Sequence, residues 1–361
     1  MKHGMMKSSR FLSMIAASAA IILATSCSSE QDEVEASLQG NVEIRLSTSV
    51  KGMVITRAAT DIQSGQFNYV AAQGEPGQEG YVAAVPELIN VEIIDAKVKA
   101  DDTPATKPAT PIRASYIFAT TNTTGGLTPT GTTPYFPNTG NKVNIYAYYP
   151  STFGTTSASS AYTWSGETPA TTFTIATDQS TAAGYKASDL MYGVPASNPV
   201  GRTNSAIPLT FTHKLAKVIV RIKGDGNGLA TSGLSDATVS MKAMTSASVD
   251  NTATATPATW SSETAAAISM GTGTSTTIES VDYYETAAIV VPQTIAANSA
   301  NVITITLPDG GVYNYTPTSA LTLETGKVHV FTITLGLNSI SVSATITPWG
   351  NGTGDSQTIV L

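Results

Sequence analysis

The only cysteine of the chain, Cys27, stands where an exported bacterial lipoprotein carries its lipid. It follows a basic start, an apolar run over residues 11–23 and the small residues at 24–26, an order typical of a secretion signal. The apolar run is shorter than the roughly 20 residues that a membrane-spanning helix needs. The sequence therefore predicts a lipoprotein signal peptide over residues 1–26 and acylation of Cys27, which would tether the chain to a membrane surface.

The other side chains able to do chemistry form no catalytic or metal-binding pattern. The two histidines that follow the signal peptide, His213 and His329, have no Cys, Asp or Glu at metal-ligand spacing along the sequence. No Gly-x-Ser-x-Gly motif marks a nucleophilic serine. Asp178 lacks the series of oxygen ligands that an EF-hand loop provides. We expect no catalytic residue, no metal site and no cofactor, and hence no enzyme.

The composition indicates an all-β protein. Only 12% of the residues are charged, and Thr, Ser, Asn and Gly fill most polar positions. Threonine is β-branched and suits a half-exposed strand, whereas apolar stripes at helical spacing are nearly absent. The formal net charge of −7 disfavours a nucleic-acid partner, because phosphate binding needs clustered Lys and Arg. The length after the signal peptide allows two domains of about 150 residues each.

Alternation of apolar and polar residues predicts the strands that build these domains. In the first strand, Val42, Ile44 and Leu46 share one face. Further strands are predicted at 81–85, 88–98, 112–120, 142–149, 173–176, 209–222, 237–244, 284–291, 302–307, 312–315, 327–335, 340–347 and 358–361. A polar stretch predicts the domain boundary near residues 200–208.

Seven short phrases, in this order along the chain, resemble the fimbrillin family, the subunits of the type V pili of Bacteroidales bacteria. They are residues 143–150, 173–180, 188–193, 209–217, 289–294, 326–332 and 342–349. The resemblance covers nearly the whole chain after the signal peptide. It implies two transthyretin-like β-sandwich domains, at residues 58–207 and 208–361, and export to the cell outer membrane as a lipid-anchored precursor.

The resemblance also implies maturation by an arginine-specific protease, which cuts in the loop after the first strand. Arg57, followed by Ala58, matches that position. Arg45 lies inside the predicted strand, where a protease would not reach it. The cut would remove residues 27–57, the tether and the first strand.

Loss of Val42, Ile44 and Leu46 would leave an open groove with unpaired main-chain groups, a template for another strand. In the family, the C-terminal region of a neighbouring subunit fills this groove, which gives a head-to-tail polymer. Two segments are candidate donors. They are the alternating strand at 340–346 and the terminal residues Gln357, Thr358, Ile359, Val360 and Leu361. Alternatively, both segments complete the sheet of their own domain.

These expectations describe a structural subunit of an extracellular fimbrium that supports adhesion, with other fimbrial subunits as partners. Two alternatives stay open at this point. The first is a tip or minor fimbrial adhesin, which needs an acceptor groove but no free donor. The second is a monomeric glycan-binding surface lipoprotein, which would keep residues 27–57.

Overall fold

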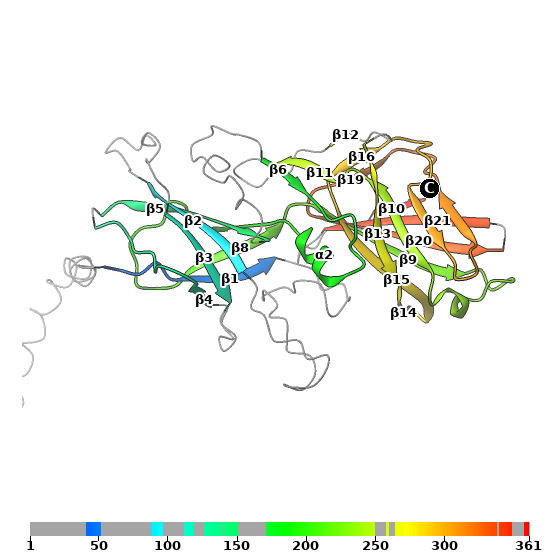
Figure 1. Ribbon diagram of the computed structural model, residues 1–361, viewed down its shortest axis with the longest axis horizontal. Helices are drawn as coiled ribbons and strands as arrows, with labels where there is room; N and C mark the ends of the chain where they lie inside the picture. The colour runs from blue at the N-terminus through cyan, green and yellow to red at the C-terminus, as the bar shows by residue number, and fades with distance from the viewer. Residues whose placement is uncertain are drawn as a thin grey trace, which may run out of the picture.

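The computed structural model describes residues 41–51, 88–96, 112–118, 126–138, 140–150, 171–249, 258–259, 264–337, 339–348 and 357–360. These residues are nearly all in strands or connecting turns (Figure 1), which confirms the all-β prediction. Within them, the helical elements are α2 (Ala182–Ala187) and a short 3-10 turn at Thr231–Leu234. The prediction of two transthyretin-like sandwiches stays a prediction at that level of detail.

Strands from the first part of the chain close into a barrel. In order around the barrel they are β1 (Leu46–Lys51), β4 (Gly126–Pro129), β3 (Ile112–Phe118), β2 (Leu88–Ala96), β5 (Lys142–Tyr149), β7 (Met191–Pro195) and β8 (Ile207–His213). β1 and β8 are parallel, and the other neighbours are antiparallel.

The barrel is filled by apolar side chains, which we call the barrel core. They are Val42, Ile44, Leu46, Ile89, Val91, Ile93, Leu127, Phe136, Val143, Ile145, Ala147, Tyr149, Met191, Ile207, Leu209 and Phe211. In β2, β5 and β8, alternate residues enter this core, as the pleat of a strand requires: Ile89, Val91 and Ile93 from β2, Val143, Ile145, Ala147 and Tyr149 from β5, and Ile207, Leu209 and Phe211 from β8.

Two larger sheets form the second lobe (Figure 1). One has the order β14 (Thr274–Ile278), β15 (Val281–Val290), β9 (Ala216–Gly224), β20 (Lys327–Gly336), β21 (Ser339–Pro348), β22 (Gln357–Val360). The other has the order β13 (Ala266–Thr272), β10 (Thr238–Ala243), β17 (Ile303–Thr306), β18 (Val312–Tyr315). Side chains from both sheets belong to one hydrophobic cluster, the second core, which includes Val220, Met241, Ile268, Ile289, Ile303 and Phe331.

Short strands complete this lobe. β6 (Thr171–Thr174) pairs with β11 (Ser246–Val249), and β16 (Gln293–Ile295) lies between β12 (Ala258–Thr259) and β19 (Leu321–Leu323). The hairpin of β17 and β18 matches the strands predicted at 302–307 and 312–315.

The segment 209–222, predicted as one strand, is in fact two strands in different sheets. β8 ends at His213 in the barrel, and β9 begins at Ala216 in the second lobe. Apolar residues continue to alternate with polar ones across the break, so the sequence looks like one strand. The buried residue before the break, Phe211, lies in the barrel core, whereas the one after it, Leu215, lies in the second core. The predicted division at 207/208 falls at the start of β8, which is itself a barrel strand.

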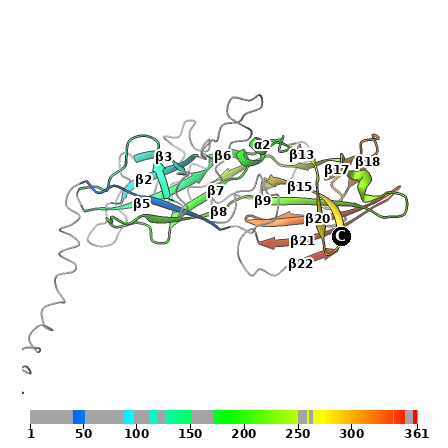
Figure 2. The same cartoon turned by 90° about the horizontal axis from the view of Figure 1, so that it is seen from below.

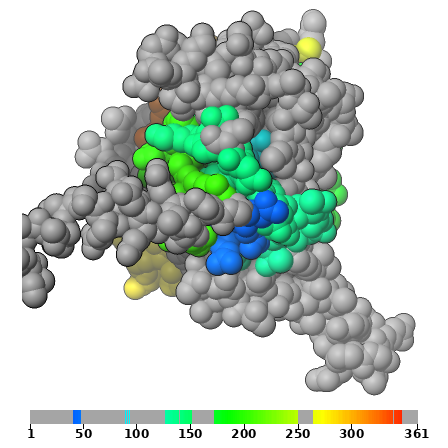
Figure 3. All heavy atoms as spheres, turned by 90° about the vertical axis from the view of Figure 1, so that its left-hand side faces the viewer, coloured from blue at the N-terminus to red at the C-terminus, as the bar shows by residue number. Residues whose placement is uncertain are grey.

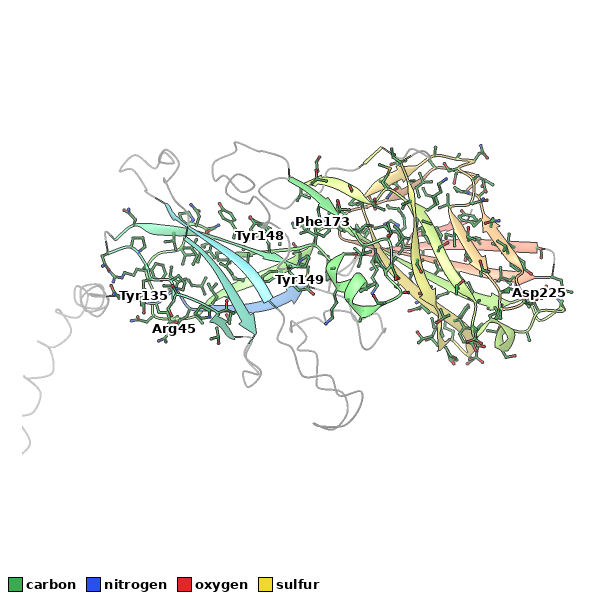
Figure 4. The ribbon with its side chains drawn as sticks, in the orientation of Figure 1. Arg45, Tyr135, Tyr148, Tyr149, Phe173 and Asp225 are labelled. Atoms are coloured by element: carbon green, nitrogen blue, oxygen red, sulfur yellow. The ribbon has the colours of Figure 1, made fainter. Side chains whose placement is uncertain are left out.

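The two lobes meet through β5 and β7, whose two faces contact different cores. Tyr149 and Met191 belong to the barrel core, whereas Tyr148 and Tyr192 belong to the second core. The rings of Tyr148 and Tyr192 lie 5.3 Å apart. Figure 4 shows Tyr148, Tyr149 and Phe173 at this junction. The same two strands therefore contribute side chains to both cores.

Candidate assembly site at the first strand

The segment that contains the first strand is a buried part of the barrel. Val42, Ile44 and Leu46 are only 7%, 1% and 1% exposed, which confirms the predicted alternation. Between them, Glu43 and Arg45 face outward, and an exposed ion pair of 3.4 Å joins the Arg45 Nε atom to the Glu43 Oε2 atom. Such exposed pairs contribute little to stability. The apolar face therefore holds the segment in place, at about 1.5–3 kcal/mol for each large side chain.

Main-chain hydrogen bonds hold both edges of this segment. On one edge, the Ile44 N–H donates to the Pro134 carbonyl at 2.9 Å, and the Phe136 N–H donates to the Val42 carbonyl at 2.9 Å. On the other edge, the Ile207 N–H donates to the Arg45 carbonyl at 2.8 Å. Figure 3 shows the outer atoms of the segment in blue on the surface of the barrel. The segment is thus bonded on both sides, to residues 134–136 and to Ile207, just before β1 begins at Leu46.

The pairing continues into β1 in a defined register. β1 runs parallel to β8 from Leu46↔Ile207 to Lys51↔Thr212, and antiparallel to β4 at Leu46↔Leu127 and Ser47↔Gly126. Without this strand, β4 and β8 would become edges beside an opened apolar core. Chemically, such a site accepts one strand with apolar residues at alternate positions.

The two candidate donor segments occupy different places in the second lobe. β21 is an inner strand, paired with β20 along its length from Gly336↔Ser339 to Lys327↔Pro348. β22 is the outer strand of the sheet and pairs with β21 from Ser343↔Val360 to Ile346↔Gln357 (Figure 2). Leaving the sheet would therefore break fewer main-chain bonds for β22 than for β21. The identity of the donor stays a prediction.

The other predicted site residues, Cys27, Arg57, Ala58 and Leu361, lie outside the described residues. Their roles in acylation, cleavage and donation stay predictions. Among the residues that the structure describes, no helix is long and apolar enough to cross a membrane.

The fold brings together one buried polar pair that local spacing does not reveal. The His213 Nδ1 atom lies 2.7 Å from the Asp189 Oδ1 atom, and both side chains are almost fully buried. The residues are 24 positions apart, so only the pairing of β7 with β8 makes them neighbours. The part of the chain that the structure describes contains no group of three or more His, Cys, Asp or Glu placed to hold a metal.

His329 is buried in the second lobe, where its Nε2 atom accepts a hydrogen bond from the Glu324 N–H at 3.0 Å. Burial penalises the charged imidazolium and lowers the pKa of His329 from 6.5 to about 4. Because the pKa is lower in the folded state, the unfolded chain binds the proton first as the pH falls. Stability from this residue is therefore complete above pH 6.5 and is lost towards pH 4.

We expect the substitution His329→Gln to remove this pH dependence. The free energy of unfolding of the wild type, minus that of the variant, should fall by about 3 kcal/mol between pH 7 and pH 4. Urea unfolding of both proteins at pH 7 and at pH 4 measures this difference in the free energy of unfolding. Parallel pH profiles for the two proteins would contradict the assignment.

Comparison with known proteins finds similarity to fimbrial proteins, both in a family model and in a single relative. Residues 90–349 match the family model described as fimbrillin-like. A protein of Bacteroides uniformis, named as a fimbrium subunit, Fim1C, is 28% identical over 247 residues, which cover 67% of this chain and 74% of that protein.

Two crystal structures of proteins described as cell adhesion proteins have the same fold. The one from Bacteroides ovatus has a TM-score of 0.55 at 16% identity and covers 86% of this chain and 98% of its own. The one from Bacteroides uniformis has a TM-score of 0.51 at 20% identity, and the match covers 85% of this chain and 98% of that protein.

Proposed function

Because the chain belongs to the fimbrillin-like family, we propose that it is a structural subunit of a cell-surface fimbrium that is assembled by strand exchange at the site of the first strand. The family is a structural one, of fimbrial and adhesion proteins, and other fimbrial subunits are the partners that it implies. The observation that carries the proposal is the first strand itself, buried and bonded on both edges between β4 and β8.

In this proposal the precursor is exported as a lipoprotein through Cys27 and cut after Arg57 by an arginine-specific protease. Cleavage there separates the first strand from the rest of the chain, so that only packing and hydrogen bonds retain it. A strand from another subunit can then replace it, provided that its apolar residues alternate in the register of Val42, Ile44 and Leu46.

The positions of acceptor and donor favour a filament. The first strand belongs to the barrel, and both candidate donor strands belong to the second lobe (Figure 1). Different surfaces of each subunit would meet at every contact, so the contact is head-to-tail and does not close into a dimer.

One observation favours the alternative of a tip or minor fimbrial adhesin. β22 is paired within its own sheet, and a subunit that ends the fibre needs no free donor strand. The acceptor site and its maturation are the same in both cases.

The substitution Arg57→Ala tests the proposal through the N-terminal residue and intact mass of the protein sheared from the cell surface. We expect the wild type to begin at Ala58 without lipid and to be found in polymer. The variant should keep its first strand and its lipid, and polymer should be lost.

Arg45→Ala is the matched control, because its side chain is 62% exposed and its removal leaves the main-chain bonds of the strand in place. This variant should be cut and assembled normally. A wild-type surface form that begins at acylated Cys27 would overturn the proposal and support the monomeric glycan-binding surface lipoprotein.

A further inference from the structure

The loop between β9 and the 3-10 turn at Thr231–Leu234 contains a short sequence with its own chemistry. It reads Asp225-Gly226-Asn227-Gly228, and Figure 4 shows Asp225 at the end of the second lobe that lies away from the barrel. Asn227 is the only asparagine among the described residues that is followed directly by glycine. An asparagine before glycine can cyclise, because no Cβ atom shields the next main-chain nitrogen.

The two groups that would react with each other are accessible. Asn227 and Gly228 are both exposed. The Asn227 N–H donates to the Asp225 Oδ1 atom at 2.9 Å. Within the described part of the chain, however, neither the Asn227 carboxamide nor the Gly228 N–H has a hydrogen-bond partner. No hydrogen bond therefore has to break before the Gly228 nitrogen reaches the side-chain amide of Asn227.

Glycines on both sides of the asparagine give this loop a main chain that other residues rarely adopt. Gly226 has a φ of +74° and Gly228 a φ of +125°. A bond of 2.9 Å from the Asp225 N–H to the Leu335 carbonyl fixes the base of the loop, and a longer one of 3.3 Å from the Gly226 N–H to the Leu229 carbonyl closes it. Local motion of such an exposed loop costs far less free energy than opening a core strand.

We propose that Asn227 is a site of spontaneous deamidation, which converts it to aspartate and isoaspartate. In the first step the Gly228 nitrogen bonds to the Asn227 Cγ atom, and the side-chain nitrogen leaves as ammonia with the proton that Gly228 loses. The product is a cyclic succinimide. Water, the only co-reactant, then opens the ring. Breaking the new bond to Cγ gives aspartate, whereas breaking the original peptide bond gives isoaspartate, whose main chain runs through Cβ and Cγ.

Either product changes the surface at this end of the second lobe. Each adds a negative charge beside Asp225, which already contacts the Asn227 N–H. Isoaspartate also lengthens the main chain next to Leu337, which is 63% exposed and packs so closely on Gly228 that a Cβ atom there would lie 2.6 Å from the Leu337 Cδ1 atom. Because Leu337 lies between β20 and β21, the modification reaches the turn between these strands. The inference does not depend on strand exchange.

Asn198, in the barrel, is a matched residue that should not react. It precedes Pro199, whose nitrogen carries no proton and so cannot close the ring. Its side-chain amide is also held in place. The Asn198 Oδ1 atom accepts from the Ile145 N–H at 2.9 Å, and the Nδ2 atom donates to the Ile145 carbonyl at 3.2 Å.

Peptide mapping of the purified full chain, incubated in mildly alkaline buffer, tests the inference. Trypsin releases Asn227 on residues 224–242 and Asn198 on residues 187–202, and neither peptide has another amide side chain. We expect the first peptide to gain the mass added when OH replaces NH2 and to separate into two products. Protein-isoaspartate methyltransferase should label one of them. The second peptide should keep its mass, and a digest at time zero gives the baseline.

The same chain unfolded in guanidinium chloride shows the reactivity of Asn227 without the folded loop. We expect the folded and unfolded chains to convert Asn227 at similar rates. Asn227 that stays intact in the folded chain would overturn the inference, whether or not the unfolded chain has reacted. Asn227→Gln is the control variant, because its longer side chain would have to form a larger ring. Its peptide should keep its mass, and an equal mass gain in this variant would also overturn the inference.

Discussion

The double variant Glu43→Cys/Tyr135→Cys, once oxidised, is expected to be cut after Arg57 yet to form no polymer. A disulfide between these positions would keep the first strand attached to the barrel after the chain is cut. Strand exchange requires that strand to leave, so assembly should stop. Adding a thiol reductant should restore polymer formation from the same sample.

The geometry at this pair suits a disulfide. Glu43 and Tyr135 form an antiparallel bridge, and the hydrogen bonds on either side of it run from Phe136 to Val42 and from Ile44 to Pro134. The two residues are thus a non-hydrogen-bonded pair, for which the Cα atoms lie about 4.5 Å apart, within the range that a disulfide spans. Figure 4 shows Tyr135 and Arg45 at this end of the barrel.

Both single cysteine variants serve as controls and should polymerise in oxidising and reducing conditions alike. For work with purified protein, Cys27 is replaced by serine so that no third thiol competes. Polymer formed by the oxidised double variant, with the disulfide confirmed by mass, would show that the first strand need not leave.

The substitution Ile44→Ala should destabilise the precursor and leave the mature subunit unchanged. Ile44 is 1% exposed in the barrel core, and truncation of such a side chain costs about 2–5 kcal/mol because a cavity remains. The mature subunit lacks this residue if the chain is cut after Arg57. Denaturant unfolding of both forms measures the difference.

Glu43→Ala is the matched control, since its side chain lies on the outer face of the same strand. Its effect should stay within about 0.5 kcal/mol. Equal destabilisation of the cut and uncut forms by Ile44→Ala would mean that the first strand is retained after cleavage.

Local patterns in the sequence predicted several strands that bury a single face but missed others, among them β13, β16 and β19. The alternation of Val42, Ile44 and Leu46 follows directly from the pleat, because successive side chains point to opposite faces. The helix α2 was not predicted, since six residues carry too short a pattern. The strand predicted at 209–222 shows the limit of this reasoning, because alternation reports burial and does not report which core a side chain enters.

The sequence also predicted some features of the candidate site and not others. The apolar face of the first strand and the arginine that follows it are visible in the sequence. The partners β4 and β8, the pairing of His213 with Asp189, and the bonds of the Asn198 amide to Ile145 are not.

The sequence by itself thus determined the all-β class, the inward face of the first strand and, through the order of its phrases, the family. Only the tertiary structure decided that the first strand lies between β4 and β8, that the chain passes between the cores after His213, and that β22 adds to its own sheet. The physical reason is that side-chain alternation is a property of a few consecutive residues. Strand pairing joins residues far apart in the chain, and the packing of the whole core selects among the registers that local patterns allow.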